Sequence, residues 1–229
     1  MNREDFSHGF DLLLSSFNTS SDIKLDEYEK SVFLTDAQEF YVLSLYNGIR
    51  DKEGFELTEE MRRYLSSLIR EAELSPITNS TGILGIDSKS KFFTLPENLW
   101  FITYESVKLS DGKCEEMMTQ EVYPVRQDEY HKIRKNPFRG ANSRRALRLD
   151  LSDDVVEIIS NYTVASYYVR YLRKLKPIVL QDFTGDIAIN GVSEATDCEL
   201  HESLHEKILE LAVQMALKAR SVYNNNENK

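Results

Sequence analysis

Hydrophobic residues recur at helical spacing at both ends of the chain. Over 3–17 the large apolar residues fall every three or four positions, which predicts a first helix. The stretch 200–222 has the longest pattern of this kind. Its apolar face consists of two adjacent rows, which are Leu200, Leu204, Ile208, Leu211, Met215 and Val222, and then Leu209, Ala212 and Ala216. A helix this apolar along one side must pack against other elements, so we expect it in the core.

Two more helices are predicted in the N-terminal third of the chain. Thr35, followed three positions later by Gln38, forms a capping-box pair, which predicts a helix that begins at Asp36. Thr58 precedes an apolar stripe of helical spacing and predicts a third helix over 59–73.

After residue 80 the pattern changes to the period of two that is typical of strands. Aromatic and β-branched residues dominate 92–109, Asp111-Gly112 is a hairpin signal, and 114–125 has the pattern of a returning strand. A short helix is predicted over 127–134.

Three further segments of this region have strand character. Leucine alternates with other residues over 146–151, which predicts a half-buried strand whose charged outer face carries Arg148. The segment 155–160 is predicted to return alongside it, and 165–172 forms a third strand or a short helix.

These elements predict an α+β fold with three regions. The regions are a helical part over 1–80, a β-rich insert of antiparallel strands over 81–180, and, over 181–229, a linker, the long last helix and a disordered Asn-rich tail. In this arrangement, helices from both chain ends form one core, and the β-rich region is inserted between them.

Composition narrows the class of protein. The chain has 229 residues, of which 41% are hydrophobic and 29% charged, as in globular proteins. Its two cysteines lie far apart without CxxC spacing, which indicates a reducing compartment and no disulfide framework. The first residues lack the pattern of a secretory signal and no apolar run approaches membrane length, so we expect no membrane partner.

Charge is divided unevenly along the chain. The formal net charge is −10, but 131–176 contains eleven Lys or Arg and four Asp or Glu, so that this block carries +7 and the remainder −17. An acidic chain of this kind is not expected to bind nucleic acid over its whole surface. Within the block, we expect an interface formed by Arg139, Arg144, Arg145 and Arg148. A set of solvated strand faces explains the block about equally well.

Two kinds of partner suit the basic block. Aromatic residues near it in sequence, including Tyr130 and Phe138, fit a surface that stacks on single-stranded nucleic acid, in particular with the basic residues of 132–148. The RNP and other nucleic-acid signatures are absent, however. Docking onto an acidic protein neighbour explains the same residues.

The most specific chemical motif is HExxH, formed by His201, Glu202 and His205. Two histidines four positions apart on one helix face can bind Zn²⁺, with the glutamate as general base of a metallopeptidase. A catalytic zinc needs a third protein ligand, and the metzincin pattern would place Gly and His where the chain has Ile208 and Leu211. We therefore interpret the two histidines as flanking residues of a packing helix and expect no metal.

No other signature of catalysis is present in the sequence. The chain contains neither a Gly-rich phosphate loop nor a GxSxG elbow. Acidic pairs such as Asp153-Asp154 and Glu115-Glu116 are interpreted as turn and surface residues. We accordingly predict no catalytic residue, no cofactor and no enzymatic activity.

Four segments together resemble a virion protein of the crAss-like gut phages. They read YEKSVFLTDAQEF over 28–40, NPFRGANSRRALRLDL over 136–151, YYVRYLRKLKPIVL over 167–180 and INGVSEATDCELHESLHEKILELAVQMA over 189–216. The resemblance covers nearly the whole chain and is closest to the neck or connector rings of these short-tailed phages.

This resemblance implies a head–tail connector, or adaptor, beneath the portal. In such a role many copies form a closed ring that joins capsid to tail, contacts the portal and neighbouring neck and tail rings, and surrounds the genomic DNA without sequence-specific binding. The helices of both chain ends would then form the adaptor core. The expected location is the virion neck or tail, after assembly in the host cytoplasm. A zinc metallopeptidase and a nucleic-acid-binding protein remain as alternative functions.

Overall fold

The computed structural model describes residues 1–17, 24–47, 59–77, 90–110, 119–152 and 154–227. The chain divides into two compact units. The first, here called the helical unit, consists of Met1–Leu68 and Leu175–Lys229, and the second, the β unit, consists of Ile69–Lys174. The predicted α+β class is confirmed, because helices lie at both ends of the chain and a seven-stranded sheet lies between them in sequence.

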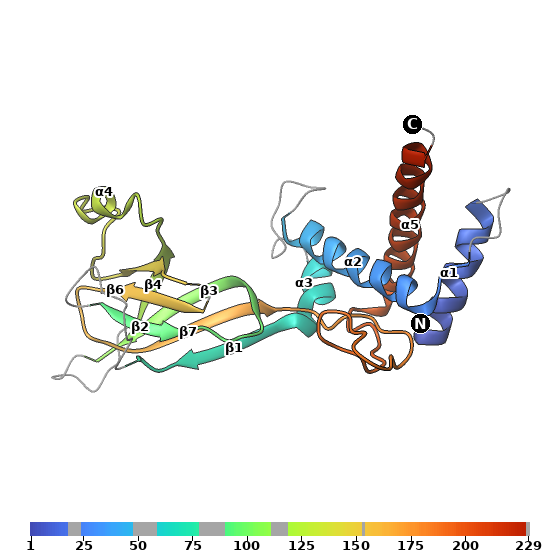
Figure 1. Cartoon of the computed structure of the whole chain (residues 1–229). Helices are drawn as coiled ribbons and strands as arrows, with labels where there is room; N and C mark the ends of the chain where they lie inside the picture. Colours follow the sequence, from blue (N-terminus) through green and yellow to red (C-terminus); the bar gives the residue numbers. More distant parts are fainter. Residues whose placement is uncertain (18–23, 48–58, 78–89, 111–118, 153, 228–229) are drawn as a thin grey trace. The chain divides into compact units, whose positions relative to one another are not determined.

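The helical unit contains four α-helices and two short 3-10 turns among its described residues. These are α1 (Arg3–Phe17), α2 (Glu27–Tyr46), α3 (Glu59–Leu65) and α5 (His205–Glu227), with 3-10 turns at Ser66–Leu68 and Glu202–Leu204. α5 packs against both α2 and α1 (Figure 1). No helix in the described part of the chain combines the length and apolar character needed to cross a bilayer.

The long C-terminal helix is confirmed, although it begins at His205 rather than at residue 200. Its buried face is displaced from the predicted rows, since Val213 is fully buried whereas Leu211 and Met215 are only partly buried. The other buried positions are Leu204, Ile208, Leu209, Ala212 and Ala216. The displacement follows from contact with two helices, because α5 packs against both α1 and α2 and so buries Val213, which lies outside the two predicted rows.

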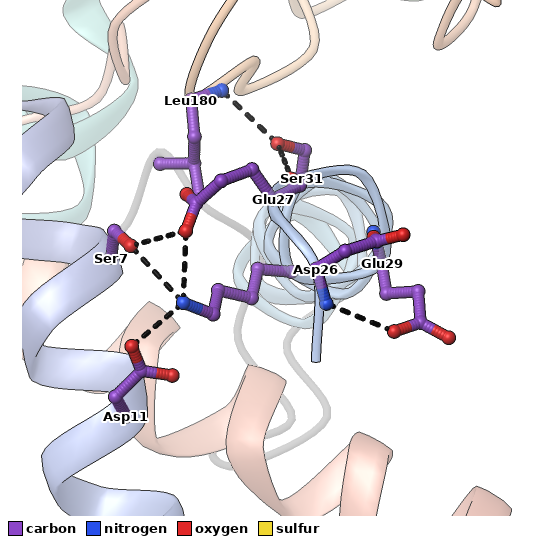
Figure 2. A network of polar contacts seen from close by, with 8 residues as sticks. Ser7, Asp11, Asp26, Glu27, Glu29, Ser31 and Leu180 are labelled. Carbon is purple, nitrogen blue, oxygen red and sulfur yellow. Dashed lines mark hydrogen bonds and ion pairs between the residues drawn. The ribbon is translucent and has the colours of Figure 1, made fainter. Parts of the chain in front are cut away.

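α2 begins nine residues earlier than predicted, at Glu27. Its N-cap is Asp26, whose side chain accepts the Glu29 N–H at 2.7 Å, while the Glu29 carboxylate accepts the Asp26 N–H at 3.1 Å (Figure 2). The predicted cap, Thr35, is buried in the middle of the helix, and its hydroxyl accepts the N–H of Ile178 at 3.1 Å. The prediction was wrong because a threonine can satisfy a distant backbone group as well as a helix end.

A buried lysine joins α1 to α2. The Lys30 ammonium is 2.8 Å from Asp11, 2.9 Å from Glu27 and 3.2 Å from the Ser7 hydroxyl, and its side chain is only 4% exposed (Figure 2). Burial alone lowers the pKa of Lys30, but the hydrogen bonds and charges of the two carboxylates more than offset it, so that the pKa is raised. Lys30 is therefore held in its charged form between the two helices.

The third predicted helix ends early. Helical structure stops at Leu68, and Ile69–Leu74 forms strand β1, which pairs antiparallel with β7 (Val164–Arg173). The apolar stripe over 59–73 is thus divided between two elements of different type. The helix prediction was wrong from residue 69 because pairing with β7 supplies long-range contacts that local spacing does not encode.

The sheet of the β unit follows the order β1-β7-β3-β4-β5-β6-β2. The remaining elements are β2 (Lys91–Thr94), β3 (Leu99–Leu109), β4 (Thr119–Pro124), α4 (Tyr130–Arg134), β5 (Arg145–Asp150) and β6 (Val155–Ile159). Each overlaps a strand or helix predicted from the sequence, but the single stretch predicted over 92–109 is divided into two strands, β2 and β3. The segment 165–172 is a strand rather than a helix. The hairpin signal at 111–112 lies outside the described residues.

One pair of neighbouring strands departs from the predicted antiparallel arrangement. β4 and β5 are parallel, while the other named pairs are antiparallel. The chain between these two strands passes through α4 and the loop after it, which gives it the length that a parallel connection requires.

The sheet curls so that its two edges meet. Ile77, just after β1, forms an antiparallel bridge with Phe92 of β2, with Ile77 N–H donating to the Phe92 carbonyl at 2.8 Å. The inner face holds a cluster of buried residues that includes Phe93, Val107 and Tyr167. On another face, Tyr130 and Ile133 of α4 pack with a second cluster, Leu147, Leu149 and Ile159. β5 is consequently buried on both faces.

Candidate interaction surface

The loop between α4 and β5, residues 136–144, is built by two asparagine side chains. We call it the arginine loop. Asn136 opens it, and its Oδ1 accepts the backbone N–H groups of Phe138 at 2.9 Å and Arg139 at 3.3 Å. Gly140 then donates to the Asn136 carbonyl at 2.8 Å, and a Cβ at Gly140 would lie only 2.9 Å from that oxygen. The first turn therefore requires glycine.

The second half of the arginine loop is fastened to the sheet. The Oδ1 of Asn142 accepts the N–H of Arg144 at 2.9 Å, and its carbonyl accepts the side chain of Gln120 at 2.7 Å. Gln120 is 1% exposed and is itself held by the Ser160 hydroxyl at 2.7 Å. Since these polar groups are buried and satisfied, they fix the loop to β4 and to the end of β6.

This fixed loop presents an aromatic ring and two arginines to solvent. Phe138 is 84% exposed, more than any other large hydrophobic residue among those described. Arg139 and Arg144 are also exposed, and in the described part of the chain neither forms an ion pair. An exposed aromatic side chain flanked by arginines, on a backbone that is already ordered, has the composition of a protein-binding hot spot.

The side chain of Arg145, the first residue of β5, packs against neighbouring residues and does not extend into solvent. Its guanidinium lies over the Tyr123 ring, with the guanidinium carbon 4.1 Å from the ring centroid, and it donates to the Phe138 carbonyl at 3.1 Å. Arg145 is half-buried. Arg145 therefore adds positive charge to the surface of the arginine loop, and its hydrogen bond to the Phe138 carbonyl fixes the loop backbone at that residue.

Arg148 lies in the core of the β unit, so the prediction that it faces outward was wrong. Its side chain is 11% exposed and donates to Glu105 at 2.7 Å and to Asp150 at 2.9 Å. The Tyr167 hydroxyl donates to the second oxygen of Glu105 at 2.6 Å. Burial raises the pKa of the Glu105 carboxyl, although Arg148 and Tyr167 act against this change. Burial likewise raises the pKa of the Tyr167 hydroxyl.

The structure thus separates the four arginines of the predicted interface. Arg139 and Arg144 are exposed in the same loop as Phe138 and Arg145 donates to the Phe138 carbonyl, while Arg148 binds Glu105 inside the sheet. From the sequence, Phe138 was recognisable only as a neighbour of the basic block, and the two asparagines that shape the loop were not predicted. The Asn-Pro pair at 136–137 was the available signal, because asparagine before such a turn commonly bonds to the backbone two residues on.

The two histidines of the HExxH motif lie in different surroundings. His201 is exposed and precedes the 3-10 turn, with its Nδ1 accepting the Ser203 N–H at 3.3 Å. α5 begins at His205, so the two side chains do not share a helix face as predicted. Among the described residues, no group of three or more His, Cys, Asp and Glu side chains is placed to hold a metal ion.

His205 is a buried packing residue. It is 5% exposed, its ring centroid is 5.3 Å from that of Phe6, and its Nε2 lies 3.0 Å from the Leu200 carbonyl oxygen. Nε2 therefore donates, which leaves Nδ1 as the acceptor toward the Met1 amino group 3.0 Å away. Burial lowers the pKa of His205, and the positive amino group acts in the same direction.

Charge is divided between the units as well as along the sequence. The helical unit contains 12 Lys or Arg and 23 Asp or Glu, a net charge of −11, whereas the β unit contains 16 and 15, a net charge of +1. Within the β unit, residues 130–149 hold seven Lys or Arg and no Asp or Glu. The arginine loop is one exposed part of this basic stretch, and Lys132, Arg134 and Lys135 before it are exposed as well.

Comparison with known proteins gives matches over the whole chain. A family model described as phage tail ring protein 3/4 matches residues 1–228. Ring protein 3 of Bacteroides phage crAss001 is 44% identical over 231 residues, which cover 99% of this chain and 100% of that protein. Ring protein 4/5 of the same phage is 32% identical over 229 residues, which cover 96% of this chain and 93% of that protein. The resemblance to crAss-like phage virion proteins is confirmed.

Proposed function

The chain belongs to the phage tail ring protein 3/4 family, and from this membership we propose that its copies form a closed neck ring beneath the portal of a crAss-like phage. As a ring protein it is a structural component of the virion. In the proposed position it acts as a head–tail adaptor that joins the capsid to the tail and surrounds the path of the genome.

The observation that carries this proposal is the extent of the match. Similarity runs from residue 1 to residue 228 and so includes both the helical unit and the β unit. Two ring proteins of one phage are 44% and 32% identical to this chain. A ring role for the whole chain is the simplest explanation of similarity to both.

The division of charge supports a channel role for the helical unit. A wall with net charge −11 per copy repels a polyanion, so DNA would pass without being bound. The helices of this unit, taken from both chain ends, would form the adaptor core. The arginine loop would then supply a contact to an acidic protein surface within the assembly, with Arg139, Arg144 and Arg145 at that contact.

Quantitative mass spectrometry of purified phage particles tests the proposal. The measurement compares the number of copies of this chain with the number of copies of the portal protein. A ratio near one, or near a small whole multiple, is the expected result for a ring matched to the portal. Absence of the chain from the particles would overturn the proposal, and a copy number unrelated to that of the portal would place the ring elsewhere.

A further inference from the structure

We propose that the arginine loop of one copy docks onto an acidic segment, residues 181–199, of the next copy in the ring. This inference rests on the proposed ring and names the partner of its basic surface. The partner is a second copy of this chain, held by contact between one face of the β unit and a different face of the helical unit.

The two segments have opposite and matching charge. Residues 130–149 contain seven Lys or Arg and no Asp or Glu, while residues 181–199 contain five Asp or Glu and no Lys or Arg. Two such segments in one chain repel copies of themselves and attract each other. They therefore favour a head-to-tail contact between copies over a symmetric one.

The acidic segment is an ordered structure and not an unstructured linker. Val179 and Thr196 exchange backbone hydrogen bonds of 3.1 Å and 3.0 Å, and Ile189 and Val192 exchange two of 2.9 Å. The tight turn of the second pair uses Asn190-Gly191, with φ angles of 48° and 81°. Asn-Gly is a strong hairpin signal that the sequence analysis did not use.

This segment presents a counterpart to each exposed feature of the arginine loop. Ile187 is 50% exposed and offers an apolar contact for Phe138. Asp186, beside it, and Glu194 are exposed, and neither forms an ion pair within the described residues. They are free to bind Arg139 and Arg144. Other acidic side chains of the segment are engaged, as in the case of Asp197 with Arg3 at 3.2 Å.

A contact of this kind leads to a ring. Because the two faces differ, each copy keeps one unused face after its first contact, and addition continues. The copies close into a ring when the rotation between neighbours returns the last copy to the first. A single aromatic anchor with a few charge pairs also gives a contact weak enough to be reversible in free solution. The assembly would then become stable only when many such contacts form at the same time, as in multivalent binding.

Thiol cross-linking of mixed proteins tests the pairing without altering either surface. In a full-length Cys114→Ser/Cys198→Ser background, one preparation carries Ser143→Cys in the arginine loop and the other carries Ala188→Cys in the acidic segment. Both positions are exposed and neither is a proposed contact residue. The proteins are treated with a short bismaleimide at low ionic strength, and the measured quantity is the fraction of dimers in which position 143 of one protein is linked to position 188 of the other. We expect this fraction to be about fivefold higher than random pairing of the two cysteines would give. Random pairing, or no dimers, would overturn the inference.

Charge reversal then distinguishes specific docking from general attraction. Arg139→Glu/Arg144→Glu in the first protein should lower 143–188 cross-linking about tenfold, and Asp186→Lys/Glu194→Lys in the second should restore it. A matched control, Lys24→Glu/Lys91→Glu, reverses two exposed charges elsewhere and should leave cross-linking within about twofold. Equal loss in the control, or no restoration, would refute the pairing. If particles contain the chain in portal-matched copies while cross-linking stays random, only this inference fails.

Discussion

Removing the Glu105 carboxylate should strongly destabilise the β unit. Its two oxygens accept the Arg148 guanidinium at 2.7 Å and the Tyr167 hydroxyl at 2.6 Å, and the residue is 8% exposed. Glu105→Ala leaves a buried guanidinium with the exposed Asp150 as its remaining ion-pair partner among the described residues, and it removes the carboxylate that accepts the Tyr167 hydroxyl. Loss of one member of a buried ion pair typically costs about 3–5 kcal/mol. Because Asp150 remains as a partner of Arg148, we expect Glu105→Ala to lower the free energy of unfolding by about 3 kcal/mol, the lower end of this range.

The chain provides a convenient probe for this measurement. Trp100, its only tryptophan, lies in β3 of the same unit and stacks on Phe101 with ring centroids 5.0 Å apart. Urea unfolding followed by tryptophan fluorescence therefore reports on the sheet that contains Glu105. Glu129→Ala is the matched control, since Glu129 is exposed and its side chain makes no capping hydrogen bond, so the change should stay within about 0.5 kcal/mol.

A second substitution separates charge burial from packing. Replacing the pair by apolar side chains, as in Glu105→Leu/Arg148→Met, removes both buried charges together and should recover most of the lost stability. A free-energy loss below about 1 kcal/mol for Glu105→Ala, or a double variant that is less stable than the single one, would contradict the assignment of this network as a buried ion pair.

Two further predictions concern the helical unit. Lys30→Met leaves two carboxylates that can still be hydrated, so it should lower the free energy of unfolding by about 1–2 kcal/mol, measured by urea unfolding followed by circular dichroism at 222 nm. Lys24→Met, at an exposed site, is the control, and an equal loss of stability there would count against the buried network. Burial lowers the pKa of His205, so the unfolded chain binds the extra proton first. Stability should therefore fall as the pH drops below about 6.5, by at most about 1.4 kcal/mol per pH unit. His205→Gln should remove this slope and His201→Gln should not; an unchanged slope in His205→Gln would refute the assignment.

Most strands of the β unit were predictable because their alternation is local. The pattern over 146–151 predicts β5, and the aromatic and β-branched content of 92–109 predicts strand structure there, although not its division into β2 and β3. The pairing of these strands could not be predicted from the sequence in the same way. The parallel contact of β4 with β5, and the bridge from Ile77 to Phe92, join residues whose relation depends on the whole sheet.

The start of α2 shows a limit of cap signals. Both Asp26 with Glu29 and Thr35 with Gln38 satisfy the capping-box spacing. The helix begins at the first because the face that includes Lys30 and Ser31 packs against the remainder of the helical unit, and Ser31 donates to the Glu27 carbonyl at 2.6 Å and accepts the Leu180 N–H at 3.0 Å. The two capping-box pairs are equivalent in the sequence. The burial of the first turn of α2, which cannot be read from the sequence, decides between them.

The position of Arg148 has a consequence for testing the basic surface. Alternation in β5 holds in the structure, since Ala146 and Arg148 face one cluster and Leu147 and Leu149 the other. The sequence does not reveal that both faces are covered, or that Glu105, 43 residues earlier, lies opposite the guanidinium. Charge reversal at Arg148 would therefore unfold the β unit, and loss of assembly in such a variant would say nothing about docking. Only the exposed arginines of the loop can test the interface, because their contacts with the described chain do not hold the fold together.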